Sequence, residues 1–95
     1  MYVILTSKPG QFRTELVAGM QAIEAYDYLF CGRKRAHFVI AELAREVKIR
    51  IVDEAAVVNL VPSKFLPRFA TLEKARAELA QLAGNGAVNA ELVRR

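Results

Sequence analysis

The stretch Tyr26-Asp27-Tyr28-Leu29-Phe30-Cys31-Gly32-Arg33-Lys34-Arg35-Ala36-His37-Phe38-Val39-Ile40 decides the fold. Side chains alternate with a period of two on either side of Gly32, as they do when successive residues of a β-strand point to opposite faces. One face of the first arm receives Tyr26, Tyr28 and Phe30, and the other receives Asp27, Leu29 and Cys31. In the second arm, one face receives Ala36, Phe38 and Ile40, and the other receives His37, Val39 and Ala41. The pattern predicts a β-hairpin whose tip carries Arg33, Lys34 and Arg35.

The second arm of this hairpin has a competing interpretation. A helical 4-3-4 spacing relates Ala36, Ile40, Leu43 and Val47, and the residues from 41 to 46 are good helix formers. Against this, His37–Ile40 favours a strand and the break at Gly32 suits a hairpin. We therefore predict a strand and keep a helix over residues 36–47 as the alternative.

Four further segments outside the hairpin have strand character. Tyr2–Leu5 is rich in β-branched and aromatic residues and stops at the turn signal Ser7-Lys8-Pro9-Gly10. Residues 12–17 can pair back across that turn. Residues 47–52 alternate apolar and basic side chains, which predicts one buried face and one cationic face. Residues 56–61 are expected to form another strand.

The C-terminal third begins with a loop and continues with a helix. Pro62 and Pro67 exclude a long helix or a central strand from residues 62–69, which we predict to be an ordered loop with one short helical turn. Thr71 can cap a helix that runs to Ala83, and Gly84 supplies its left-handed stop. An apolar stripe on this helix is expected to lie on the sheet and consists of Leu72, Ala75, Leu79 and Leu82.

Together these segments predict an α+β fold: a curled antiparallel sheet of about five strands, as a meander or a small half-open barrel, with one C-terminal amphipathic helix. Residues 1–84 are expected to form a single small domain. Residues 85–95 contain little to anchor them, so we predict a mobile tail unless Val88 and Leu92 find a partner surface.

The composition indicates a folded chain with a surplus of apolar surface. Its 95 residues are 54% apolar and 25% charged, with a net charge of +4. One modest core is expected at this length, and a partner can cover the remaining apolar surface. The basic excess, largest at the hairpin tip, suits an acidic protein surface, nucleic acid or anionic lipid.

Two features predict a cytoplasmic setting without a membrane segment. No apolar run reaches the length needed to cross a bilayer, and residues 1–7 lack the pattern of a secretory signal. The single cysteine cannot form an internal disulfide, which favours a reducing compartment.

The residues able to carry chemistry are few. Cys31 and His37 fall short of the three or four ligands that a zinc site uses, so we expect no metal within one chain. His37 is the one candidate base for Cys31 as a nucleophile, and the neighbouring cations make Cys31 a candidate reactive thiol. No acid–base pair of carboxylates and no glycine-rich phosphate loop stands out, so we expect neither a cofactor nor an enzyme.

Two segments are candidates for binding. The tip cations with the flanking aromatics combine phosphate neutralisation with base stacking, although such aromatics are more often core residues. The second segment, residues 61–69, is too apolar for a solvated loop. It therefore either covers the core, which is the more frequent role, or docks on another protein. Its candidate residues are Lys64, Phe65, Leu66, Arg68 and Phe69.

From these observations we predict a non-enzymatic accessory or regulatory protein that binds a larger protein partner through the basic tip and the apolar loop. The alternative is an RNA or single-stranded DNA binding module that uses the same cations and the sheet aromatics. A weaker alternative is a redox or ligand-sensing role for Cys31. Because sheet edges must be managed in so small a domain, a homodimer formed by edge pairing or through the apolar excess is a further expectation.

Overall fold

The structure is a computed structural model of the chain that describes residues 1–84 and 89–95. These residues form seven strands, one short 3-10 helix and one α-helix. The strands are β1 (Tyr2–Ser7), β2 (Phe12–Glu15), β3 (Met20–Phe30), β4 (Arg33–Leu43), β5 (Lys48–Asp53), β6 (Val58–Pro62) and β7 (Ala90–Arg94), and the helices are η1 (Ser63–Phe65) and α1 (Leu72–Leu82). The predicted α+β class is confirmed.

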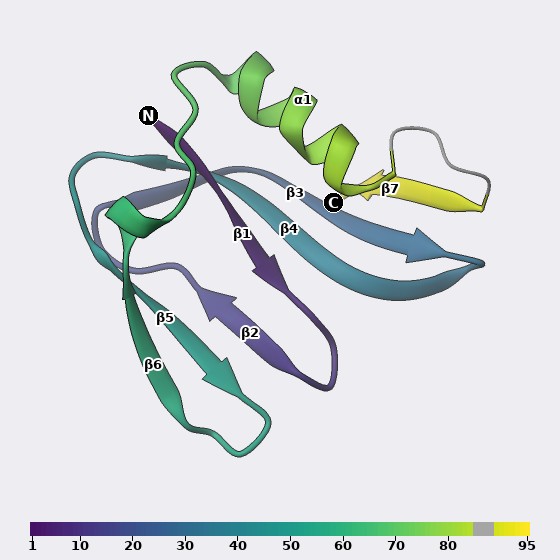
Figure 1. The fold of residues 1–95 in the computed structure, drawn as a ribbon, viewed down its shortest axis with the longest axis horizontal. Helices are drawn as coiled ribbons and strands as arrows, with labels where there is room; N and C mark the ends of the chain where they lie inside the picture. The colour runs from purple at the N-terminus through teal and green to yellow at the C-terminus, as the bar shows by residue number, and fades with distance from the viewer. Residues whose placement is uncertain (85–88) are drawn as a thin grey trace.

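The strands form two antiparallel sheets, which corrects the expectation of about five strands in one curled sheet. Sheet A has the order β1-β4-β3-β7 and sheet B has the order β2-β5-β6 (Figure 1). Neither closes into a barrel within the described residues. The break falls between β1 and β2, which follow one another along the chain but pair with β4 and β5 respectively.

The central hairpin of sheet A is the one that the alternating pattern predicts. β3 and β4 are 11 residues each and pair along their whole length. β4 also pairs with β1 on its other side, so both of its backbone edges are satisfied by neighbouring strands. The helical alternative for residues 36–47 is therefore wrong.

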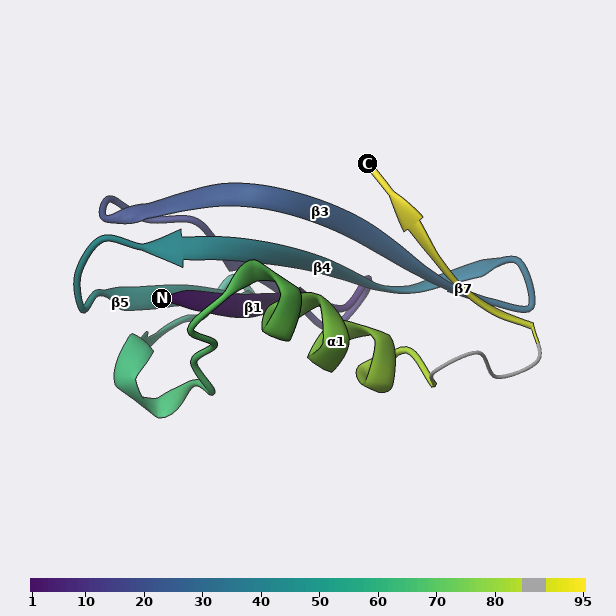
Figure 2. The ribbon, with the colours of Figure 1, turned by 90° about the horizontal axis from the view of Figure 1, so that it is seen from above.

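Sheet A contributes to two hydrophobic clusters, one from each face. On one face, Phe38 and Ile40 pack with Ala75 and Leu79 of α1. On the opposite face, Val3, Leu5 and Ala41 pack with Ile49 of sheet B. Helix α1 thus lies across one face of sheet A (Figure 2), and Ile49 of β5 brings sheet B against part of the other face.

Helix α1 begins and ends as its sequence predicts. The Thr71 hydroxyl accepts a hydrogen bond from the Lys74 backbone N–H at 3.2 Å, and Gly84 has a left-handed φ of 87°. The predicted stripe holds for Leu72, Ala75 and Leu79, which lie in or against the core. Leu82 departs from it and is 53% exposed; it lines a groove between the end of α1 and the sheet.

The segment after residue 88 is ordered as an added strand. β7 pairs antiparallel with β3, and Leu92 packs against the α1-side cluster. Leu92 therefore meets the condition under which the tail was expected to be ordered, whereas Val88 lies outside the described residues.

The loop between β6 and α1 has the predicted short helical turn, η1. Two backbone hydrogen bonds between Tyr2 and Phe69, at 2.8 and 2.9 Å, fasten its end to β1. Within the described residues, no helix combines the length and apolar character needed to span a bilayer.

Candidate functional site

The hairpin tip is a two-residue turn, Cys31-Gly32, with both residues in the left-handed region. Their φ values are 53° and 76°, which is typical of the type I′ turns that join tightly paired strands. The turn matches the predicted reversal at Gly32. Cys31 is exposed, and its backbone N–H donates to the Asn89 carbonyl at 2.9 Å, so the tip is also fastened to the chain just before β7.

A β-bulge just after the tip separates the three predicted cations. The register runs from Tyr28 opposite Ala36 to Leu29 opposite Lys34, which leaves Arg35 without a partner. An extra residue in one strand reverses the side-chain alternation beyond it. Lys34 therefore shares a face with His37, and Arg35 lines a groove on the α1 side. The run of cations does not form one patch.

On the face away from α1, Asp27 binds three cationic or potentially cationic groups. His37, directly opposite Asp27 on β4, donates from Nδ1 to Asp27 Oδ1 at 2.7 Å. The Lys34 ammonium lies 3.2 Å from the same oxygen, and Arg95 Nε donates to Oδ2 at 2.8 Å. The hydrogen bonds from His37 and then Arg95 hold the pKa of Asp27 far below its ordinary value. The carboxylate joins β3, β4 and the end of β7.

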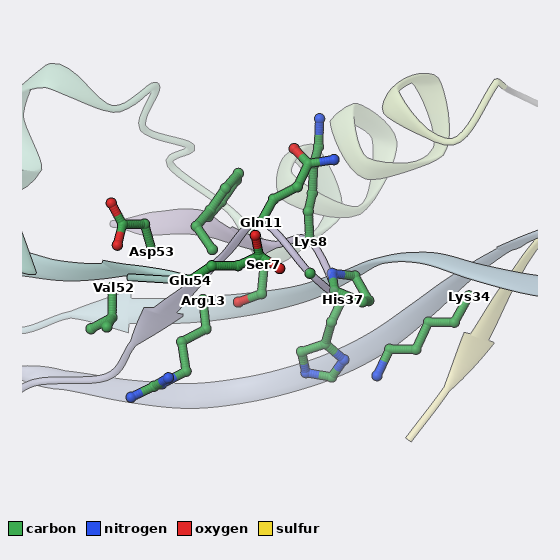
Figure 3. Close-up of a pocket in the computed structure, with 12 residues that line it drawn as sticks. Ser7, Lys8, Gln11, Arg13, Lys34, His37, Val52, Asp53 and Glu54 are labelled. Carbon is green, nitrogen blue, oxygen red and sulfur yellow. The ribbon is translucent and has the colours of Figure 1, made fainter. Parts of the chain in front are cut away.

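His37 also lines a pocket of about 470 Å³ beside the β1–β2 turn (Figure 3). Its lining mixes cations with carboxylates and includes Arg13, Lys34, Asp53 and Glu54. Ser7 is the register partner of His37 on β1, but its hydroxyl accepts from the Thr14 backbone N–H at 2.9 Å. Among the described residues no hydrogen bond joins Ser7 to His37, so the row Asp27, His37, Ser7 lacks the nucleophile–base contact of a triad.

Cys31 and His37 are not brought together. Cys31 lies in the turn, whereas the His37 ring is bound by Asp27 further along the hairpin. Within residues 1–84 and 89–95, no group of three or more histidine, cysteine or acidic side chains is placed to hold a metal ion.

On the α1 side of sheet A, Glu24 forms a second buried carboxylate site. Arg76 of α1 donates to it from Nε at 3.0 Å and also from its terminal nitrogen. Tyr26 donates its hydroxyl at 2.8 Å, and the guanidinium of Arg94 on β7 lies 3.3 Å away. These contacts, led by the Arg76 hydrogen bonds, lower the pKa of Glu24 from 4.5 to about 2. Glu24 thereby ties α1 and β7 to β3, a role that the sequence does not signal.

The predicted apolar loop divides between core and surface. Leu66 packs against the cluster between the sheets and Phe69 against the cluster under α1, so both cover the core. Arg68 pairs with Glu46. Of the three predicted apolar residues, Phe65 is the exposed one, at 69%, with the Lys64 ammonium 5.6 Å from the centre of its ring.

The largest concentration of exposed apolar side chains lies along β6, where the sequence analysis places no site. Val57, Val58 and Leu60 are 52%, 42% and 55% exposed, and η1, directly after β6, adds Phe65. We call these four residues the β6 surface. The sequence does contain a signal for this surface. A strand with one wet face alternates apolar and polar residues, whereas Val57 and Val61 point to one face of the strand and Val58 and Leu60 to the other, so apolar side chains lie on both faces.

The surroundings of the β6 surface are basic. Among the described strands, β6 is an edge strand that pairs with β5 alone. Leu60 is directly opposite Arg50, and Pro62 is opposite Lys48, so these side chains share the outer face of sheet B. Arg50 and Arg13 both pair with Glu15, at 3.0 and 3.1 Å. With three cations and one carboxylate, this face carries a net charge of +2.

Comparisons with known proteins add no assignment. No family model, no curated protein and no solved structure matches the chain. The candidate sites therefore rest on the geometry described above.

Proposed function

We propose that this protein is a non-enzymatic accessory or regulatory module that binds a larger protein partner through the β6 surface. The observation that carries the proposal is the exposure of Val57, Val58 and Leu60 along an edge strand. Exposed apolar side chains beside unpaired backbone groups are the elements that proteins use to add a strand from a partner.

The occupant that best fits this surface is an extended acidic segment of the partner. Added along β6, such a segment would satisfy the free backbone edge and place alternate apolar side chains against Val58 and Leu60. Lys48 and Arg50 lie on β5, on the far side of β6 from the added strand, and the positive potential that they give this face favours association with an acidic partner. Phe65 extends the apolar contact beyond the end of β6.

The basic tip is assigned a secondary role in this proposal. It lies at the end of sheet A remote from β6 (Figure 1). Arg33 at the tip is exposed. The longest dimension of the molecule is 37 Å, so only a partner large enough to reach from the β6 surface to the tip would also contact Arg33. A reducing cytoplasm, in which the exposed Cys31 stays a free thiol, is the setting that the proposal assumes.

The test is position-specific photocrosslinking in the native cell extract after RNase treatment. A benzophenone amino acid replaces Leu60 in one variant and Glu73, an exposed residue of α1, in the control. We expect crosslinks from position 60 to one protein, within a peptide rich in acidic and apolar residues, and none to that peptide from position 73. Amides of β6 should exchange more slowly with solvent in the complex.

Two outcomes would overturn the proposal. If positions 60 and 73 crosslink to the same mixture of proteins, the β6 surface is not a specific interface. If position 60 crosslinks only to a second copy of this chain, the surface is a homodimer interface instead of a site for another protein.

A further inference from the structure

A separate groove lies on the α1 side of sheet A, at the end of the helix. It encloses about 450 Å³, within the range of about 300–1,000 Å³ typical of small-molecule sites. Tyr28 and Phe38 contribute aromatic rings from the sheet, Arg35 comes from the bulge of β4, and Lys8 and Gln11 come from the β1–β2 turn. Leu82, at the end of α1, forms the remaining wall.

The charge of this groove has one sign. Lys8 and Arg35 line it, and among the described residues no carboxylate does. Neither cation forms an ion pair with any described residue. Lys8 and Gln11 also line the pocket on the His37 side, where Asp53 and Glu54 stand among the cations, whereas Arg35 lines the α1-side groove and not that pocket. Arg35 therefore gives the α1-side groove a positive charge that no ion pair with a described residue offsets.

The backbone directs these polar groups into the groove. The bulge turns Arg35 onto the face of Tyr28, whereas regular alternation would place Arg35 beside His37. Figure 3 shows Lys8 and Gln11 pointing away from His37 and Lys34, toward the side of the sheet on which α1 lies. Lys8 of the turn and Arg35 of the hairpin thus lie on the same face of the sheet.

The apolar wall suits a flat ring. The Tyr28 and Phe38 rings are tilted by 52° with centroids 6.4 Å apart. Phe38 is buried and forms the floor, Tyr28 is half-buried, and Leu82 is 53% exposed opposite them. A planar ring between Tyr28 and Leu82 would cover this leucine, which nothing else in the described chain covers. Aromatic side chains stack on nucleobases in this way.

We propose that this groove binds a nucleotide, with the base between Tyr28 and Leu82 and the phosphate held by Arg35 and Lys8. A guanidinium can donate two parallel hydrogen bonds to a phosphate, and the ammonium adds a point charge. The Gln11 amide can donate to or accept from the edge of the base. This site does not depend on the proposed role of the β6 surface. The nucleotide that it binds is either a free molecule or one unit of a single-stranded nucleic acid.

The experiment titrates the isotope-labelled full chain with AMP and follows the Leu82 methyl groups and the Tyr28 ring by NMR. Adenosine and inorganic phosphate are separate arms, and an eight-residue oligoadenylate is a fourth. We expect saturable shifts at both residues with AMP, with affinity at least about tenfold above that for adenosine or phosphate alone, because each of these makes half of the contacts. Tighter binding of the oligonucleotide than of AMP would identify a single strand as the source, and equal binding a free nucleotide.

A matched pair of variants tests the geometry. Arg35→Gln should weaken AMP binding about tenfold, whereas Lys34→Gln, one residue away on the opposite face, should leave it unchanged. Equal losses in the two variants would overturn the proposal, because binding would then follow total charge. It would also be overturned by the absence of saturable shifts with AMP, or by phosphate binding as tightly as AMP.

Discussion

Sheet A packs on both faces, against α1 on one side and against Ile49 of sheet B on the other, whereas Lys48, Arg50 and Leu60 on the outer face of sheet B are exposed. Ile40 on the central strand of sheet A is fully buried, and Leu60 on the edge of sheet B is 55% exposed. The two buried carboxylates, Glu24 and Asp27, also lie on sheet A. The difference suggests that sheet A holds the fold together and that the outer face of sheet B is free to serve binding.

The largest effect is expected from a cavity in sheet A. Ile40 has no exposed surface and packs in the cluster between β4 and α1. Ile40→Ala should lower the free energy of unfolding by about 3–4 kcal/mol, because the transfer energy of the removed methyl groups is lost and the site collapses only in part. Denaturant unfolding followed by circular dichroism measures the change. A loss below about 1 kcal/mol would contradict the placement of the core.

The second effect comes from the carboxylate that ties α1 and β7 to β3. Glu24→Gln keeps the shape of the side chain but removes the charge that Arg76 and Arg94 neutralise. We expect a loss of about 2 kcal/mol at pH 7, typical of a charge-assisted hydrogen bond network with one buried partner. Glu15→Gln is the matched control on sheet B, where the carboxylate pairs with exposed arginines, and its effect should be smaller.

The pH dependence of the same pair gives a sharper check. The pKa of Glu24 falls from 4.5 to about 2 on folding, so its contribution is complete above pH 4.5 and is lost as the pH falls toward 2. The difference in unfolding free energy between wild type and Glu24→Gln should therefore shrink across this interval. Because other carboxylates titrate in both proteins, their contributions cancel in the difference. A difference that stayed constant down to pH 2 would place the stabilisation elsewhere.

The features that the sequence could predict are those that depend on local signals. Alternation at Tyr26–Phe30 and Ala36–Ile40 is a local signal, and it correctly located the central hairpin. The cap at Thr71 and the stop at Gly84 are also local and correctly bounded α1. The bulge at Arg35 has no such signal, since a slip of one residue depends on how the two strands pair. Strict alternation therefore places Lys34 and Arg35 on the wrong faces.

Non-local pairing accounts for the other differences. β7 is a short, partly charged segment whose order depends on the edge of β3, far away in sequence. The separation into two sheets depends on the different partners of β1 and β2, which the turn between them does not specify. For the apolar loop, the residue types indicate that a side chain is either buried or available for binding, but they do not indicate which. Leu66 and Phe69 cover the core, and Phe65 does not.

A smaller effect, of opposite sign, is expected at the hairpin tip. Cys31 adopts a φ of 53°, which a type I′ turn requires and which asparagine accepts more readily than cysteine. Cys31→Asn should raise the free energy of unfolding by about 0.5 kcal/mol, because less backbone strain is stored in the turn. Thermal unfolding measures it, with Cys31→Ser as the control that removes the thiol without this preference. Equal stability of the two variants would show that the turn is not strained.

The smallest effect should come from the β6 surface, where it separates binding from stability. Leu60 stays 55% exposed after folding, so Leu60→Ser should change the free energy of unfolding by no more than about 0.5 kcal/mol. The same substitution removes the apolar centre of the proposed docking surface and should weaken binding of the crosslinked partner by at least about tenfold. Titration of the purified partner measures the second quantity. If Leu60→Ser instead lost as much unfolding free energy as Ile40→Ala and still bound the partner, Leu60 would belong to the core. Sheet B would then serve stability and not binding, which is the reverse of the comparison made above.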